Sequence, residues 1–286
     1  MSGANASPTR SASAIARSLK KGRSHQEMTG IASWKSAPVL LGIVSFAVIL
    51  LVWESVVRLG WANPFFISQP SAIAVSLGRA AQSGELWHNL AVSLREFAIG
   101  YSASVVVGIL AGALAGRFRT VEYALDPFLW FLYSAPLISF YPIFVLWFGL
   151  GVPAVIAITF LLSVTQITVS TLSGIQNVNP GLLRAARSFG ASERDLLWKV
   201  VLPASVPMVI AGLRLGIGRA LMGVVVGELF GATAGLGFSI AYYGALLKTT
   251  DMIASLVVIV GLGVLCTQAL SAVEARFDSW RTGPGS

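Results

Sequence analysis

The chain has 286 residues, of which 55% are hydrophobic and only 11% charged, and its mean hydropathy is +0.77. Soluble globular domains carry roughly a quarter charged residues. This chain therefore lacks the polar surface to cover a core in water, and we expect lipid to be its solvent. The net charge of +8 would suit nucleic acid. However, the basic residues lie between apolar runs, as topology determinants of membrane proteins do, so we expect no nucleic-acid partner. The single cysteine, Cys266, excludes a disulfide framework or a multi-cysteine metal site within this chain.

Apolar runs of spanning length predict an all-α integral membrane protein with about six transmembrane helices. A helix needs about 20 residues to cross the hydrocarbon core. The spans are expected at about 37–57, 97–116, 124–149, 152–173, 206–228 and 252–273. Residues 1–36 are polar and basic and have no apolar run of the kind a signal peptide needs, so we predict a disordered cytoplasmic tail. A transmembrane domain over 37–275 and a second cytoplasmic tail over 276–286 complete the expected organisation.

The segment between the first two spans predicts a helix outside the bilayer. Ser71, after Pro70, is a plausible N-cap for an amphipathic, interfacial helix. The second span then carries glycines at four-residue spacing, Gly108, Gly112 and Gly116. Such a strip lets another helix approach closely, and packing within this chain is favoured over a subunit interface.

Prolines inside the third span predict a kink or a break. Pro136 and Pro142 each remove a hydrogen bond from the helix ladder, and irregular backbone at membrane depth is tolerated inside protein or beside water. The segment 134–142 is therefore a candidate translocation pathway, with a kink that only serves packing as the alternative. Its candidate pathway residues are Ser134, Pro136, Ser139 and Tyr141.

Polar and ionisable residues also occur near membrane depth. The fourth span carries Gln166 and a run of Ser and Thr, and the ionisable residues are Glu54, Arg95, Glu96, Arg214, Arg219 and Glu228. Because charges are costly in hydrocarbon, such side chains usually face the bundle interior or water. We add Gln166, Arg214, Arg219 and Glu228 to the candidate pathway. Either arginine could attract an anion there, or both could be structural, snorkelling to the interface or forming ion pairs.

The distribution of Lys and Arg predicts the orientation. If the N-terminus is inside, most basic residues fall on the same side as the segments 117–123 and 174–205 and the C-terminus. The opposite side holds only Arg58, Arg79, Arg95 and Lys248, leaving aside the two arginines within the fifth span. The positive-inside rule then places both termini and the loop 175–203 in the cytoplasm.

This cytoplasmic loop predicts a helix–glycine–helix elbow. Asn179 followed by proline is a helix start, and Gly190 is a good C-terminal cap. Ser192 begins a second short helix with Asp195 as its capping-box partner, and that helix is expected to end before Pro203. Small residues near the tip, Ala185 and Ala186, would let another protein's surface come close.

At these residues the sequence resembles the EAA loop of binding-protein-dependent ABC transporter permeases. The resemblance rests on Arg184-Ala185-Ala186, Gly190, Val200 and Leu202-Pro203 at matching spacing. It implies that the elbow is a coupling helix that docks on a cytoplasmic ATPase. The coupling residues would be Arg184, Ala185, Ala186, Phe189, Gly190, Leu202 and Pro203. Arg184 stands where glutamate is usual and reverses the charge at that position, and Val200 replaces isoleucine.

Further motifs resemble the nitrate/sulfonate/taurine branch of this family. They are Pro70-Ser71, Pro142-Ile143-Phe144, Leu146 to Gly151, Gly212-Leu213-Arg214 and Gly235-Leu236-Gly237. The resemblance implies a type I importer permease that moves a small anion, an organic sulfonate or a vitamin-precursor-like molecule across the inner membrane by alternating access. It also implies three partners: an ATPase subunit that carries ATP and Mg²⁺, an external solute-binding protein, and a second permease copy.

No glycine-rich stretch ends in Gly-Lys-Ser/Thr, so we expect this chain to bind no ATP itself. It is expected to hold no metal, and its two histidines, His25 and His88, make no catalytic pair. The alternative function is a stand-alone secondary transporter or channel, using the broken span and the intramembrane charges. A membrane-embedded enzyme is disfavoured because no pair of carboxylates or nucleophile–base set is evident on one membrane face.

Overall fold

The computed structural model describes residues 37–278, and this part of the chain is helical throughout, with no strand. The long helices are α2 (Ala37–Arg58), α4 (Glu85–Arg117), α7 (Val152–Gln176), α10 (Leu202–Gly231) and α12 (Thr249–Asp278). The shorter ones are α3 (Pro70–Gln82), α5 (Arg119–Ser134), η1 (Leu137–Phe140), α6 (Tyr141–Phe148), α8 (Pro180–Ser188), α9 (Glu193–Asp195), η2 (Leu196–Val201) and α11 (Leu236–Ala245). The predicted tail 1–36 lies outside the described residues, as does the C-terminal segment from 279.

Helix α2 belongs to a separate unit that ends at Pro64, and the other helices form the unit from Phe65 onward. Nearly all apolar side chains of α2 are exposed, including those of Leu41, Phe46 and Leu51. A helix of 22 residues with this surface requires lipid or another protein around it. This agrees with the predicted first span.

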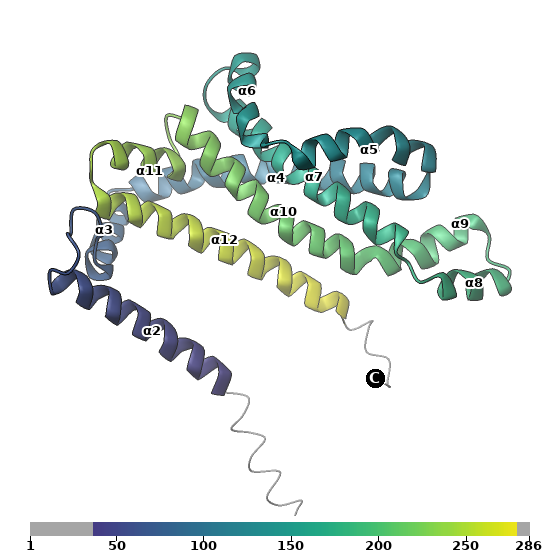
Figure 1. Ribbon diagram of the computed structural model, residues 1–286, viewed down its shortest axis with the longest axis horizontal. Helices are drawn as coiled ribbons and strands as arrows, with labels where there is room; N and C mark the ends of the chain where they lie inside the picture. Colours follow the sequence, from purple (N-terminus) through teal and green to yellow (C-terminus); the bar gives the residue numbers. More distant parts are fainter. Residues whose placement is uncertain (1–36, 279–286) are drawn as a thin grey trace, which may run out of the picture. The chain divides into compact units, whose positions relative to one another are not determined.

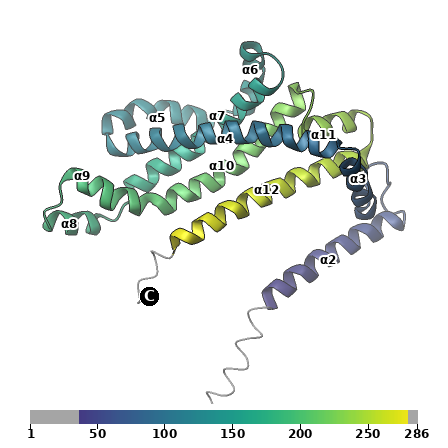
Figure 2. The ribbon, with the colours of Figure 1, turned by 180° about the vertical axis from the view of Figure 1, so that it is seen from behind.

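The core of the larger unit is α7, which lies between α4 and α10 (Figures 1 and 2). Glycines on both neighbours make this close approach possible. A Cβ atom at Gly112 on α4 would lie 2.6 Å from the Thr168 carbonyl oxygen, and one at Gly223 on α10 would lie 2.6 Å from the Thr159 Cα atom. The predicted glycine strip therefore packs within the chain.

Several buried hydroxyl groups on α7 have hydrogen-bond partners, although those of Thr159 and Thr171 have none among the described residues. Ser163 donates to the Thr159 carbonyl at 2.7 Å, and Thr168 donates to the Val164 carbonyl at 2.8 Å. Such bonds to the preceding turn allow Ser and Thr inside a membrane helix. Ser104 of α4 also lies 2.6 Å from Ser163. Much of the predicted polar run is therefore part of the packed core.

The third predicted span is broken, as its prolines predicted. Helix α5 and the segment Leu137–Phe148 meet at an angle of 98°. The break lies at residues 135–136, where Ala135 has an extended backbone, and the 3₁₀ turn η1 leads from it into α6. Five described helices are long and apolar enough to cross a membrane, or six if this bent pair counts as one span.

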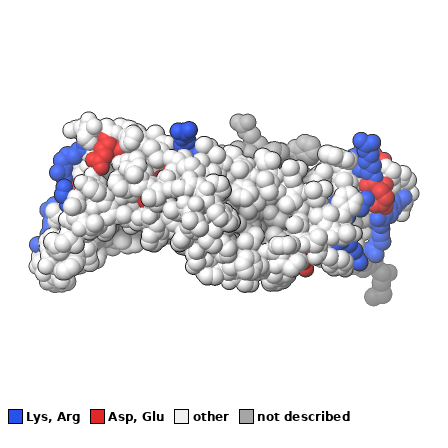
Figure 3. All heavy atoms as spheres, turned by 90° about the horizontal axis from the view of Figure 1, so that it is seen from above, with Lys and Arg blue, Asp and Glu red and all other residues white. Residues whose placement is uncertain are grey.

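The charged residues gather at the ends of the helices. In the space-filling view, most Lys and Arg atoms lie toward the two ends, one group lies between them on the upper edge, and white atoms cover most of the remaining surface (Figure 3). We call the end with α8 and α9 the elbow end and the end with α3 and α11 the α11 end (Figure 1). An uncharged band between charged ends fits a helix bundle in a bilayer.

Two sequence-based boundaries differ from the structure. Helix α4 begins at Glu85, well before the predicted span 97–116. Its first turns are polar and bury only one face, with Asn89 and Ser93, so hydropathy alone does not detect them. Helix α3 starts at Pro70 with Gln69 as the N-cap, so Ser71 is not the cap. Proline suits this first position because it has no N–H to leave unsatisfied.

Candidate functional site: a coupling elbow and a polar cavity

The elbow has the caps that its sequence predicted. The Asn179 side chain accepts a hydrogen bond from the Gly181 backbone N–H at 2.8 Å. Gly190 closes α8 with a φ of +81°, a left-handed conformation that favours glycine. Ser192 then accepts from the Asp195 N–H at 3.2 Å, which opens the next helix.

Apolar side chains are exposed around this elbow. Phe189, beside Gly190 at the tip, has 92% of its surface exposed, and Leu182 and Trp198 are also exposed. The small Ala185 is exposed and Ala186 is half-buried. An aromatic side chain that stands free in this way is typical of an anchor for a partner's pocket.

Ion pairs stabilise the elbow, but the exposed Arg184 takes no part in them. Glu193 accepts from Arg187 at 3.1 Å and lies 3.9 Å from Arg117 at the end of α4. Lys199 pairs with Asp195 at 2.6 Å. Arg184 is exposed and forms no ion pair with any residue of the range 37–278. Its positive charge therefore faces outward.

The elbow is continuous with α10, which corrects the prediction that its second helix ends before Pro203. From Glu193 the chain runs through α9 and the π-helical turn η2 into α10, as one helical stretch to Gly231. Pro203 directly follows the π-helical turn η2, where the regular α-helical hydrogen-bond ladder is already interrupted. The second half of the elbow and α10 are therefore one continuous helical stretch.

Three predicted pathway residues, Pro136, Gln166 and Arg219, lie around one cavity. This cavity has a volume of about 210 Å³ and is bounded by the break after α5, by α7 and by α10. The sequence did not single out Tyr133, Thr165 or Met222, which also line it. Ser134 and Ser139 are exposed on the broken segment but do not line it.

The two intramembrane arginines differ in their surroundings. Arg214 pairs with Glu274 of α12 and donates to Ser271 at 3.1 Å. Arg219, about one and a half turns further along α10, is exposed and has no ion-pair partner among the described residues. Arg214 thus connects α10 to α12, whereas Arg219 lines the cavity without an ion-pair partner among the described residues.

Two other predicted pathway residues lie in buried positions away from the cavity. Tyr141 is 4% exposed and packs with the apolar Leu137 and Ile158. Glu228 is 1% exposed and accepts hydrogen bonds from Ser93 and from the Gly237 backbone N–H, both at 2.6 Å. Residues distant in sequence create this environment, so hydropathy gave no signal for it.

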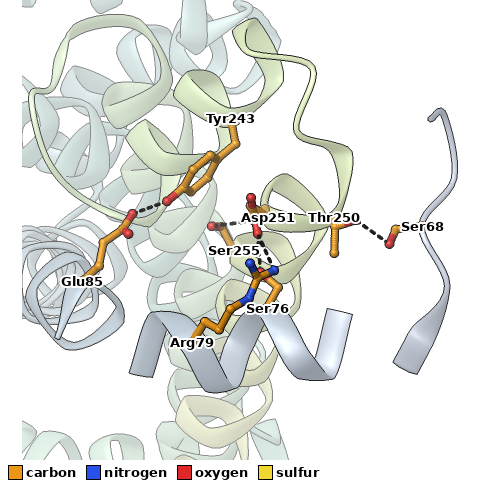
Figure 4. A network of polar contacts seen from close by, with 8 residues as sticks. All are labelled: Ser68, Ser76, Arg79, Glu85, Tyr243, Thr250, Asp251 and Ser255. Atoms are coloured by element: carbon orange, nitrogen blue, oxygen red, sulfur yellow. Dashed lines mark hydrogen bonds and ion pairs between the residues drawn. The ribbon is translucent and has the colours of Figure 1, made fainter. Parts of the chain in front are cut away.

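A network of polar contacts at the α11 end joins α3 to α12 and α4 to α11 (Figure 4). Asp251 of α12 accepts from Ser76 and lies 3.9 Å from Arg79 of α3. The Tyr243 hydroxyl donates to Glu85 at the start of α4. Burial, together with this carboxylate, raises the pKa of Tyr243.

A helix bundle of membrane-spanning length, with a broken span beside a cavity that an arginine lines and an elbow that continues into a spanning helix, fits a membrane transport permease. The sequence matches the family of binding-protein-dependent transport system inner membrane components over residues 104–279. The chain belongs to this family, and it is a permease of the ATP-driven importer class.

Curated relatives place it in the branch that its motifs indicated. The chain is 34% identical to the taurine transport system permease protein TauC of Escherichia coli (strain K12), over 86% of this chain and 91% of that protein. It is 30% identical to the putative aliphatic sulfonates transport permease protein SsuC of Bacillus subtilis (strain 168), over 84% and 87%. It is also 30% identical to the formylaminopyrimidine transport permease protein ThiX of Halalkalibacterium halodurans, over 82% and 94%.

Solved structures support the fold. An amino acid ABC transporter with histidines is similar with a TM-score of 0.56 and 16% identity, over 71% of this chain and 97% of that one. The MetNI methionine ABC transporter in an inward-facing conformation gives a TM-score of 0.50 and 23% identity, over 68% and 95%. These likenesses confirm the predicted type I importer permease fold. The relatives support the importer and not the secondary transporter.

Proposed function

We propose that two copies of this chain form the membrane pathway of an importer for a small anion that carries a sulfonate or a similar group. The observation that carries the proposal is the unpaired Arg219 beside the cavity formed by the broken span. The relatives named for taurine and aliphatic sulfonates support this class of substrate.

The position of Arg219 supports a pathway rather than a lipid-facing role. It lies in the interior of α10, with twelve residues of the helix beyond it up to Gly231. A guanidinium group there is costly against hydrocarbon and is stable beside water or an anion. Gln166 and Thr165 on the same cavity add hydrogen-bonding groups for the oxygens of such an anion. In this account, the exposed side of Arg219 faces the second copy across the pathway.

The elbow is the proposed docking site for a cytoplasmic ATPase, which would supply ATP and Mg²⁺ on a separate chain. Phe189 would enter a groove on that subunit, with Ala185 allowing close contact. The continuous helix from the elbow into α10 would carry the ATPase motion to Arg219. The elbow end and both termini are then cytoplasmic, and the α11 end faces the external solute-binding protein.

Uptake by charge variants tests the anion site. A strain that lacks the chain is complemented with wild type, Arg219→Gln or Arg214→Gln, and the uptake of labelled taurine and ethanesulfonate is measured. We expect Arg219→Gln to reduce uptake at least tenfold with the chain still in the membrane, because a buried charge-assisted contact contributes about 1.5–3 kcal/mol. Arg214→Gln, which removes a bracing contact, should lower the amount of folded chain instead. Wild-type uptake by Arg219→Gln would contradict the proposed site.

A further inference from the structure

A buried polar cluster fastens the start of α11 to α4 and α10, and nothing in the transport proposal uses it. The three backbone N–H groups at the first turn of α11 are donors that a helix cannot satisfy internally. Each donates to a side-chain oxygen from another helix: Gly235 to Asn89 Oδ1 at 3.0 Å, Leu236 to Ser93 Oγ at 2.9 Å, and Gly237 to Glu228 Oε2 at 2.6 Å. These contacts join three helices at one point.

Two carboxyl groups meet within this cluster. Glu228 is 1% exposed and both of its oxygens accept hydrogen bonds, one from Ser93 and one from Gly237. Glu96, one turn after Ser93 on α4, is fully buried, and its carboxyl faces that of Glu228. Neither Glu96 oxygen receives a hydrogen bond. The structure thus reveals a carboxylate pair that the sequence did not indicate.

Among the side chains that the structure describes, no cation balances this pair, and neither glutamate forms an ion pair with Lys or Arg. The other buried groups nearby are neutral hydroxyls: Tyr141 from α6 and Thr159 from α7, and neither hydroxyl has a partner. The start of α11 contributes backbone N–H groups only. The titratable groups that face Glu96 are therefore Glu228 and Tyr141.

The inventory of donors decides which carboxyl group is charged. Glu228 lies at the N-terminus of the ten-residue helix α11, where backbone N–H groups and the helix dipole favour an anion. Glu96 has no donor at all, and an ionised carboxylate without donors or a cation is very costly when buried. A proton on Glu96 removes that charge and gives its O–H an acceptor, a Glu228 oxygen.

We infer that Glu96 is a neutral carboxylic acid and that Glu96 and Glu228 together bind one proton as part of the joint between α4, α10 and α11. A cleft of about 220 Å³ at the α11 end reaches Asn89 and Ser239, which are hydrogen-bonded to each other at 2.9 Å. Ser93 lies one turn beyond Asn89 and contacts Glu228. Ser93, the partner of Glu228, is therefore one helical turn from a residue that lines the cleft.

Infrared spectroscopy of the full-length chain in lipid nanodiscs tests the assignment directly. At neutral pH, wild type should show the carbonyl band of a protonated carboxylic acid that Glu96→Gln lacks. The matched control is Glu85→Gln, which removes an exposed carboxylate of the same helix and should leave the band unchanged. An acid band that persists undiminished in Glu96→Gln, or is missing in wild type, would overturn the inference.

Thermal unfolding at several pH values gives an independent readout. A proton that is bound in the folded chain and released on unfolding makes stability fall as pH rises. The melting temperature of wild type and of Glu85→Gln should therefore drop more steeply from neutral to alkaline pH than that of Glu96→Gln. The glutamine amide can still donate to Glu228, so the variant should fold. Parallel pH profiles, or a Glu96→Gln chain that does not fold, would contradict the proton-bearing pair.

Discussion

The elbow and the joint at the α11 end are built in opposite ways. In the elbow, Phe189 and Arg184 stand exposed without partners in the described part of the chain. At the α11 end, Asn89, Ser93 and Glu228 are buried and each is hydrogen-bonded to a backbone N–H of another segment. The first arrangement leaves contacts for another protein to complete, whereas the second holds three helices of this chain together. Substitutions in the elbow are therefore expected to leave the fold intact but to impair function.

The largest loss of fold is expected when the close approach of α4 and α7 is blocked. In Gly112→Leu, the new Cβ alone would lie 2.6 Å from a backbone oxygen, and overpacking costs typically 1–3 kcal/mol or more. We expect little folded chain and a strongly lowered melting temperature in detergent. Gly261→Leu is the control, because nothing lies within 4 Å of a Cβ there. Equal melting temperatures for the two variants would contradict the packing account.

The largest loss of function with the fold retained is expected at Gly190. Gly190→Trp strains a backbone with a φ of +81°, which costs about 1–2 kcal/mol, and places a bulky side chain at the docking tip. Substrate uptake should be abolished while membrane insertion is unchanged. Gly84→Trp is the control, because it imposes similar strain at a φ of +82° at the opposite end of the bundle. That variant should still bind the ATPase subunit.

A smaller effect is expected when the aromatic anchor alone is removed. Phe189→Ala should weaken ATPase association by about 2 kcal/mol or more, as interface hot spots do. This corresponds to at least a roughly thirtyfold loss of affinity, measured by titrating purified ATPase onto the chain in nanodiscs. Phe66→Ala, which removes another exposed phenylalanine outside the elbow, is the control. Unchanged affinity in Phe189→Ala would remove this residue from the docking surface.

The smallest effect is expected from the elbow's cap. Ser192→Ala removes the oxygen that accepts from the Asp195 N–H, and loss of such a cap costs about 1 kcal/mol. The elbow should fray locally, which limited proteolysis between residues 190 and 196 would detect, with uptake reduced only a fewfold. Ser188→Ala, which removes a bond to the preceding turn of α8, should be almost silent.

Local signals predicted the elbow and the broken span well. Caps, proline positions and a single left-handed glycine depend on neighbouring residues, and the structure confirms Asn179, Gly190 and Ser192 in these roles. The resemblance to a permease family was confirmed by the match over residues 104–279. The π-helical continuity into α10 was missed because Pro203 was interpreted as a stop, although a helix can continue through a proline at a π-helical irregularity.

Long-range signals were missing for the polar side chains. Glu96 and Glu228 are far apart in the sequence, and only the packing of α4 against α10 and α11 brings them together. The sequence also gave no basis for distinguishing Arg214 from Arg219, because the contact that distinguishes them comes from Glu274 on α12. Which of the pathway residues touch the substrate stays a prediction, and Arg219 is the one to test first.

The central claim is that the elbow couples this permease to an ATPase. The most direct test is affinity purification of the tagged chain from native membranes, as wild type and as Gly190→Trp, with mass spectrometry of the proteins that co-purify. We predict a stoichiometric subunit with a Walker A motif in the wild-type sample and its loss from Gly190→Trp, with the variant still inserted. Equal recovery of that subunit with both chains, or a wild-type chain that purifies alone even after crosslinking, would contradict the account.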